Sequence, residues 1–147
     1  MVRSSFVCIA SLLLCVSTGV SQQPTVQIRI ELINGLNGNP WKRTEVGLEV
    51  SPDYRELKVQ TDENGVATIS IQRDSTIFTH NTKRYVACAD EAGGLVHNDF
   101  KVSQIISTGI VQPVAKPNRC SVITGVPIPG ELVIFVRPWA FLEDNPL

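Results

Sequence analysis

Apolar and polar residues alternate in short runs along most of the chain, a pattern typical of strands that bury one face. In the run over 26–32, every second residue is apolar, whereas the run over 132–136 is apolar throughout and predicts a central strand buried on both faces. Residues that favour turns separate the runs. The pattern predicts an all-β domain of about seven strands. These strands span residues 26–32, 45–50, 57–59, 66–71, 77–79, 84–89 and 132–136.

The strongest local signal is the turn Thr61-Asp62-Glu63-Asn64-Gly65 between two of these runs. Its Asn-Gly pair supplies the positive φ angles that tight connections need. We therefore expect a β-hairpin across 57–71.

The stretch between residues 90 and 130 departs from the alternation. Apolar residues spaced i, i+3 and i+4 over 102–106 predict a short helix, capped by Asn98 or Asp99 and closed at Gly109. Several prolines follow, so the rest of the stretch is expected to be a long, ordered loop.

The segment over 1–21 has the three parts of a secretory signal peptide. Arg3 supplies a positive charge, the stretch over 6–16 is almost wholly apolar, and small or polar residues follow. The apolar run is too short to span a bilayer comfortably. We expect cleavage after Ser21, or after Gly19, which leaves one domain over 22–147 in a secreted or periplasmic protein. A buried N-terminal helix is the alternative, but no amphipathic face is visible.

A lipid anchor at Cys15 is a further alternative, which would make the protein a membrane-tethered envelope subunit. Lipoprotein signals carry a small residue before the cysteine, whereas this chain has Leu14. We therefore expect neither a lipid anchor nor a membrane span, and we interpret Cys8 and Cys15 as apolar residues of the signal.

The charge balance excludes two classes of partner. Loss of Arg3 with the signal leaves 12 of the 13 Lys and Arg residues against 14 Asp and Glu, a net charge of about −2. Without a basic excess or a basic cluster, we expect no nucleic-acid partner and no anionic membrane surface.

Only Cys88 and Cys120 remain after cleavage. In an oxidising compartment, two cysteines in one small domain most simply form a disulfide. Closing a loop of about 33 residues stabilises a fold by roughly 3–4 kcal/mol in the chain-entropy model. A reactive or metal-bound thiol is the alternative, but neither cysteine lies in a CxxC pair or near a histidine in sequence.

Two turn motifs resemble those of a known fold family. Gly38-Asn39-Pro40 follows the first predicted strand, and the turn over 61–65 precedes the strand over 66–71. Across residues 25–72 this order resembles the prealbumin-like sandwich of carboxypeptidase regulatory-like domains. The resemblance implies a single antiparallel, Ig-like β-sandwich, and it implies no activity.

The later part of the chain carries a second, weaker resemblance. The excursion between Cys88 and Cys120 and the ending over 129–138 are similar to those of small secreted bacterial proteins with no established activity.

Two enzyme families with this sandwich allow a comparison. Transthyretin-like hydrolases end in Tyr-Arg-Gly-Ser, whereas this chain ends in Asp144-Asn145-Pro146-Leu147. Intradiol dioxygenases bind iron through two Tyr and two His, and the mature chain has Tyr54, Tyr85, His80 and His97. Those enzymes place their histidines close together on one strand, whereas His80 and His97 fall in separate parts of this sequence. We therefore expect neither activity.

His80, His97 and Asp99, with the acidic loop over 90–99, are the remaining candidates for a metal site. Short polar clusters after a strand are far more often solvated loops and helix caps. The chain has no Gly-x-Ser-x-Gly motif and no Gly-rich phosphate loop followed by Lys-Ser/Thr. We expect no catalytic residue, no metal and no cofactor.

Trp41, Trp139 and Phe141 form the predicted binding surface, because exposed aromatic rings stack on sugars or contact partner chains. The alternative for Trp139 and Phe141 is that the tail folds back over the core, since it follows the central strand directly. For Trp41 both interpretations stay open.

These observations predict an exported, non-catalytic binding or structural module that acts on a protein or glycan partner. The alternative is a small periplasmic enzyme or metal-binding protein that uses His80, His97 and the loop over 90–99. The binding hypothesis predicts an exposed aromatic or apolar patch. The enzyme hypothesis predicts that the two histidines converge in a pocket.

Overall fold

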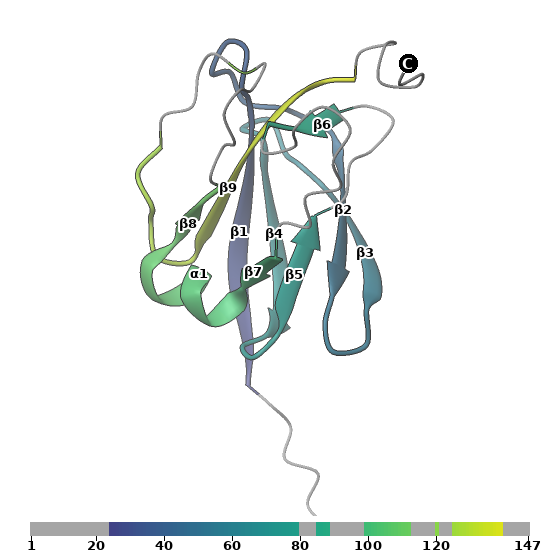
Figure 1. Ribbon diagram of the computed structural model, residues 1–147, viewed down its shortest axis with the longest axis vertical. Coiled ribbons are helices and arrows are strands. Elements are labelled where there is room, and N and C mark those ends of the chain that lie inside the picture. The colour runs from purple at the N-terminus through teal and green to yellow at the C-terminus, as the bar shows by residue number, and fades with distance from the viewer. Residues whose placement is uncertain (1–23, 80–84, 89–98, 113–119, 121–124, 140–147) are drawn as a thin grey trace, which may run out of the picture.

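The structure is a computed structural model that describes residues 24–79, 85–88, 99–112, 120 and 125–139. Within these residues, nine strands form two sheets, and one short helix packs beside them (Figure 1). The predicted signal peptide over 1–21 lies outside the described residues. The elements are β1 (Thr25–Asn34), β2 (Glu45–Val50), β3 (Arg55–Gln60), β4 (Val66–Gln72), β5 (Thr76–Thr79), β6 (Tyr85–Ala87), β7 (Asp99–Lys101), α1 (Val102–Thr108), β8 (Ile110–Val111) and β9 (Glu131–Pro138).

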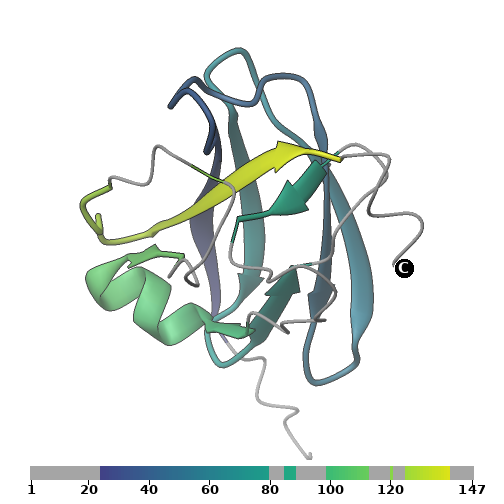
Figure 2. The same cartoon turned by 45° about the horizontal axis from the view of Figure 1, so that its top comes forward.

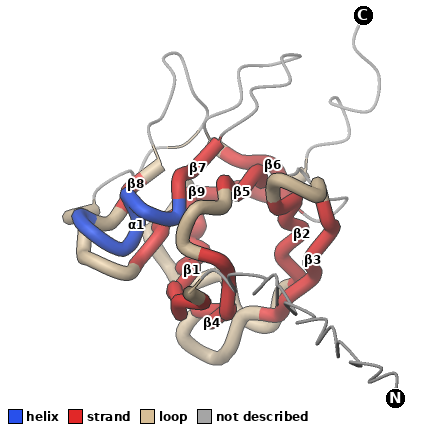
Figure 3. Tube along the Cα trace, turned by 90° about the horizontal axis from the view of Figure 1, so that it is seen from below, coloured by secondary structure: helices blue, strands red, loops and turns tan. Residues whose placement is uncertain are grey.

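The first sheet has the strand order β4-β1-β9-β6, with β8 also paired to β9, and the second has the order β3-β2-β5-β7. Viewed from below, strands of both sheets surround a common interior, and α1 lies beside β8 at one side (Figure 3). With the top of the molecule turned forward, the helix is again seen at one side of the strands (Figure 2). The all-β prediction is confirmed at this level. Sequence analysis missed β7 and β8, because such short strands cannot show an alternation.

Strand direction differs from the prediction in the first sheet. The second sheet is antiparallel throughout, as expected. In the first sheet, β9 runs parallel to β1 and to β8, so the expectation of a wholly antiparallel domain is wrong. A parallel pair needs a long crossover, which the excursion before β9 provides. The alternation of apolar residues is the same in parallel and antiparallel strands, so the sequence pattern could not reveal the direction of β9.

Alternate residues of both sheets meet in one hydrophobic core, which also receives Val102 and Ile105 of α1. β9 is buried along almost its whole length, which confirms the predicted central strand. The other buried members of the core are Ile28, Ile30, Leu32, Val46, Leu48, Val50, Ile69, Ile71, Ile77, Tyr85, Phe100, Leu132, Ile134 and Val136.

The predicted turn at Asn64-Gly65 forms, but the strands that it joins do not pair. β3 pairs with β2 and β4 pairs with β1, so the chain crosses between the sheets here and the predicted hairpin is wrong. The Asp62 carboxylate accepts hydrogen bonds from the N–H groups of Val66 (2.9 Å) and Asn64 (2.8 Å), which lower its pKa. The Gly65 carbonyl accepts a bond from the Leu32 N–H (2.9 Å) and thereby directs the chain to β1.

The short helix predicted over 102–106 is confirmed as α1. It ends at Gly109, which has a φ of 73° and donates its N–H to the Ile105 carbonyl at 2.9 Å. The N-cap is Lys101 without a side-chain bond, so the predicted caps are wrong: Asp99 belongs to β7, and Asn98 lies outside the described residues. Within the described chain, no helix is long and apolar enough to cross a bilayer.

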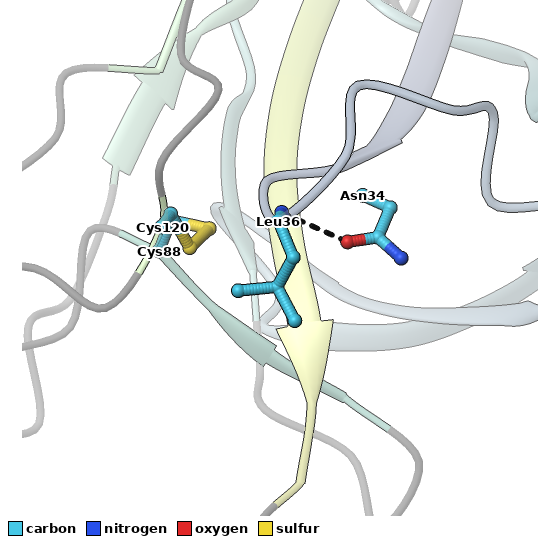
Figure 4. Close-up of a disulfide and its surroundings, with 4 residues drawn as sticks. All are labelled: Asn34, Leu36, Cys88 and Cys120. Atoms are coloured by element: carbon cyan, nitrogen blue, oxygen red, sulfur yellow. Dashed lines mark hydrogen bonds between the residues drawn. A yellow bond between two sulfur atoms is a disulfide. The ribbon is translucent and has the colours of Figure 1, made fainter.

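Cys88 and Cys120, the predicted pair, form a disulfide with a Cα–Cα distance of 6.0 Å (Figure 4). The bridge packs with outward-facing residues of β9 in a small second cluster. Beside it, the Asn34 side-chain oxygen accepts a hydrogen bond from the Leu36 N–H at 2.9 Å. Gly35 lies so close that a Cβ there would approach Cys120 Sγ to 2.8 Å. The disulfide therefore holds Cys120 against β9 and against Gly35 after the end of β1.

Candidate functional site

The structure describes two of the three aromatic residues predicted to form a binding surface. Trp41 is half-buried and packs on the core, edge to face with Tyr85 at a centroid distance of 6.5 Å. Trp139 is half-buried just after β9, and Phe141 lies outside the described residues. Trp41 therefore contributes at least one face of its ring to core packing.

The predicted metal candidates fall mostly outside the described part of the chain. His80, His97 and the loop over 90–98 lie there. Asp99 is exposed on β7. Among the residues that the structure describes, no group of three or more His, Cys, Asp or Glu side chains gathers to hold a metal ion.

The most exposed aromatic side chain of the described chain is Tyr54, in the turn between β2 and β3. It is 64% exposed and has a positive φ of 51°, a conformation that is uncommon for a bulky residue. Its ring stacks on Phe78 of β5, with a centroid distance of 6.0 Å and an interplanar angle of 28°. Backbone strain of this kind is often found where a side chain is held for function.

Two carboxylates flank this aromatic pair. In the sheet register, Phe78 lies between Glu49 of β2 and Asp99 of β7. The neighbouring Ile77 is fully buried, so Phe78 and its two cross-strand partners point away from the core. We call Tyr54, Phe78, Glu49 and Asp99 the aromatic platform.

The sheet surface next to the platform has open space at Gly47. Gly47 lies two residues before Glu49 on the same side of β2, and a Cβ built there would have no atom within 4 Å. Opposite Gly47, Lys58 of β3 forms an ion pair with Glu56 at 3.2 Å, which raises the pKa of Lys58. A ligand longer than the platform could therefore extend along this face without meeting a side chain at Gly47.

The platform suits a ligand with an apolar face and a hydroxyl-bearing edge. A ring such as Tyr54 offers apolar area at a low entropy cost, because its side chain has few rotatable bonds. The oxygens of Glu49 and Asp99 accept hydrogen bonds from hydroxyl groups, and bonds to an ionised acceptor are the stronger kind. Their negative charge also opposes phosphate-rich ligands.

A second polar cluster joins β1 to β9 on the outer side of the first sheet. The buried Glu131 side chain has its Oε2 3.7 Å from Nη1 of Arg29. Burial raises the pKa of Glu31, as do a hydrogen bond to Glu131 and the charge of Glu131, whereas Arg29 lowers it. The Glu31 and Glu131 carboxyl groups therefore lie close enough to interact across the parallel strands β1 and β9.

Sequence analysis missed the aromatic platform, although part of the signal was present. In the predicted strand over 77–79, Phe78 alternates with two inward residues and so belongs on the outer face. Tyr54 follows Ser51-Pro52-Asp53, a polar turn in which a large aromatic ring has no core to enter. What the pattern could not show is that this turn and a strand well separated from it in the sequence meet in the fold.

Comparison with protein-family models, with curated proteins and with solved structures gave no significant match to this chain.

Proposed function

We propose that this chain is an exported, non-catalytic module that binds glycans through the aromatic platform. The observation that carries the proposal is the stacking of a largely exposed Tyr54, held at a positive φ, on Phe78. The two stacked rings offer an aromatic surface larger than that of a single exposed residue, and a ligand that covers it gains free energy by burying it.

A glycan fits this surface better than the other partner classes. The C–H face of a sugar ring covers the exposed ring of Tyr54, and its hydroxyls donate to Glu49 and Asp99. A protein partner of comparable affinity would need a larger apolar centre sealed by surrounding contacts. Nucleic acid would be repelled by the two carboxylates.

We also propose that the fold is a prealbumin-like β-sandwich in an exported protein. Two sheets that share one core support the sandwich, and the turn Gly38-Asn39-Pro40 after the first strand supports the family resemblance. The disulfide between Cys88 and Cys120 supports an oxidising compartment, outside the cytosol. The expected signal peptide over 1–21 is consistent with it.

The test is affinity electrophoresis of the mature protein through gels that contain cellulose, xylan, chitin or peptidoglycan fragments. We expect at least one polymer to retard the wild type. Tyr54→Ala should weaken that retardation about tenfold, because loss of a stacking ring costs about 1.5 kcal/mol. Tyr54→Phe is the matched control: it keeps the ring and should keep most of the binding.

A second variant separates binding from folding. Tyr54→Asn removes the ring but suits the positive φ, since Asn adopts this conformation more readily than Tyr. We expect it to lose retardation while its free energy of unfolding stays within about 1 kcal/mol of wild type. Equal retardation of wild type, Tyr54→Ala and Tyr54→Asn on every retaining polymer would refute the platform as the binding surface.

A further inference from the structure

A pocket of about 230 Å³ lies beside the β2–β3 turn, and none of the four platform residues lines it. Its walls come from the start of β1, the β2–β3 turn and the end of β4. Its floor includes Val50 and Ile71, which belong to the core between the two sheets. The pocket therefore borders the edge of the core, and it shares no residue with the aromatic platform.

The pocket carries charges of both signs. Asp53 and Arg55 both line it, and neither side chain forms an ion pair with another described residue. Opposite charges in one cavity give no net attraction for an anion or for a cation. Each charged group is left with hydrogen-bonding capacity that a neutral polar ligand can use.

Hydroxyl groups supply most of the remaining polar lining. Ser51 Oγ accepts a hydrogen bond from the Thr76 N–H at 2.9 Å, so its own O–H proton remains to be donated. Ser70 is exposed on the edge strand β4 and adds a second hydroxyl to the wall. Donors and acceptors thus surround an apolar floor, an arrangement that matches a ring with hydroxyls on its edge and C–H groups on its face.

The volume limits the ligand to one small ring. Pockets for drug-sized ligands measure about 300–1,000 Å³. We infer that this pocket binds a single neutral sugar unit, at a site distinct from the aromatic platform. This inference stands on the pocket residues alone and does not require that the platform bind a polymer.

The experiment is a titration of ¹⁵N-labelled mature protein with methyl α-D-glucopyranoside, followed by backbone amide shifts. We expect saturable shifts at residues 51–55 and 70–72, with a Kd of millimolar order, about 1–10 mM. Ser70→Phe fills the pocket and should abolish these shifts. Thr68→Phe is the matched control, because Thr68 is equally exposed on β4 but does not line the pocket.

Two further titrations distinguish binding in the pocket from binding at the platform and from non-specific shifts. Asp99→Asn, on the platform, should leave the shifts at 51–55 and 70–72 saturable with an unchanged Kd, since Asp99 lies on β7 and does not line the pocket. Glycine, a zwitterion without hydroxyls, should cause none. No saturation with the glucoside, shifts with glycine alone, or shifts that persist in Ser70→Phe would each overturn the inference.

Discussion

The close approach of Gly35 to the disulfide makes a quantitative prediction about how the bridge and the main fold are coupled. In Gly35→Ala, the new Cβ would lie 2.8 Å from Cys120 Sγ and 2.9 Å from Cys120 Cβ, and closer still to Cys88 Sγ. Real Cβ atoms do not tolerate such distances, so the bridge or the backbone must shift. The Gly35 N–H also donates to the Val136 carbonyl at 2.7 Å, which limits the shift of the backbone.

The magnitude follows from two contributions. Overpacking by one methyl group costs about 1–3 kcal/mol when the surroundings cannot relax. The cross-link itself, between residues separated by 32 positions, contributes about 3–4 kcal/mol in the chain-entropy model. In a Cys88→Ala/Cys120→Ala background both sulfur atoms are gone. The Cβ of residue 120 remains but is no longer held by the cross-link and can move away, so Gly35→Ala should cost about 1 kcal/mol or less there.

The assay is equilibrium unfolding in guanidinium chloride of the wild type, Gly35→Ala, the double-alanine protein and the triple variant. The double-mutant cycle should give a coupling energy of about 1–2 kcal/mol. Additivity within about 0.5 kcal/mol would refute the reasoning, because it would mean that the methyl group does not meet the sulfur atoms.

Two further predictions concern titrating groups. Burial and Glu131 raise the pKa of Glu31 above its usual value of 4.5. The contribution of Glu31 to folding stability is therefore fully present below the pKa of the unfolded chain, and it is lost as the pH rises through the pKa of the folded protein. Glu31→Gln should therefore flatten the dependence of unfolding free energy on pH above about 4.5, and an unchanged slope would contradict this origin. Burial raises the pKa of Tyr85 to about 12, although a hydrogen bond from the Gly47 backbone lowers it. Tyr85 is the one tyrosine left in Tyr54→Phe, so its phenol should titrate near pH 12 when followed by ultraviolet absorbance. Titration near pH 10 while the circular dichroism spectrum stays native would contradict the burial of this ring.

Local pattern was enough to predict most elements but not their partners. The alternation over 26–32 and the apolar run over 132–136 correspond to β1 and β9, which are the two central strands of the first sheet. The Asn64-Gly65 turn was also predicted correctly. Its strands separate because the Gly65 carbonyl bonds to Leu32 of β1, a contact between distant parts of the sequence that no local pattern contains.

The candidate site shows the same limit. Sequence reasoning chose Trp41 because large aromatic residues after a turn are good candidates, but its ring packs on the core beside Tyr85. Tyr54 was not predicted to belong to a binding surface, although its ring is more exposed than that of Trp41. Its role depends on Phe78 of a different strand, and only the fold brings the two together.

The central claim is that ligands bind at the aromatic platform, and a crystal structure with an oligosaccharide of a retaining polymer tests it most directly. We expect a sugar ring stacked on Tyr54, with hydroxyl groups within hydrogen-bond distance of Glu49 or Asp99. An oligosaccharide bound instead at Trp41 or Trp139, with the surface around Tyr54 and Phe78 left uncovered, would contradict it.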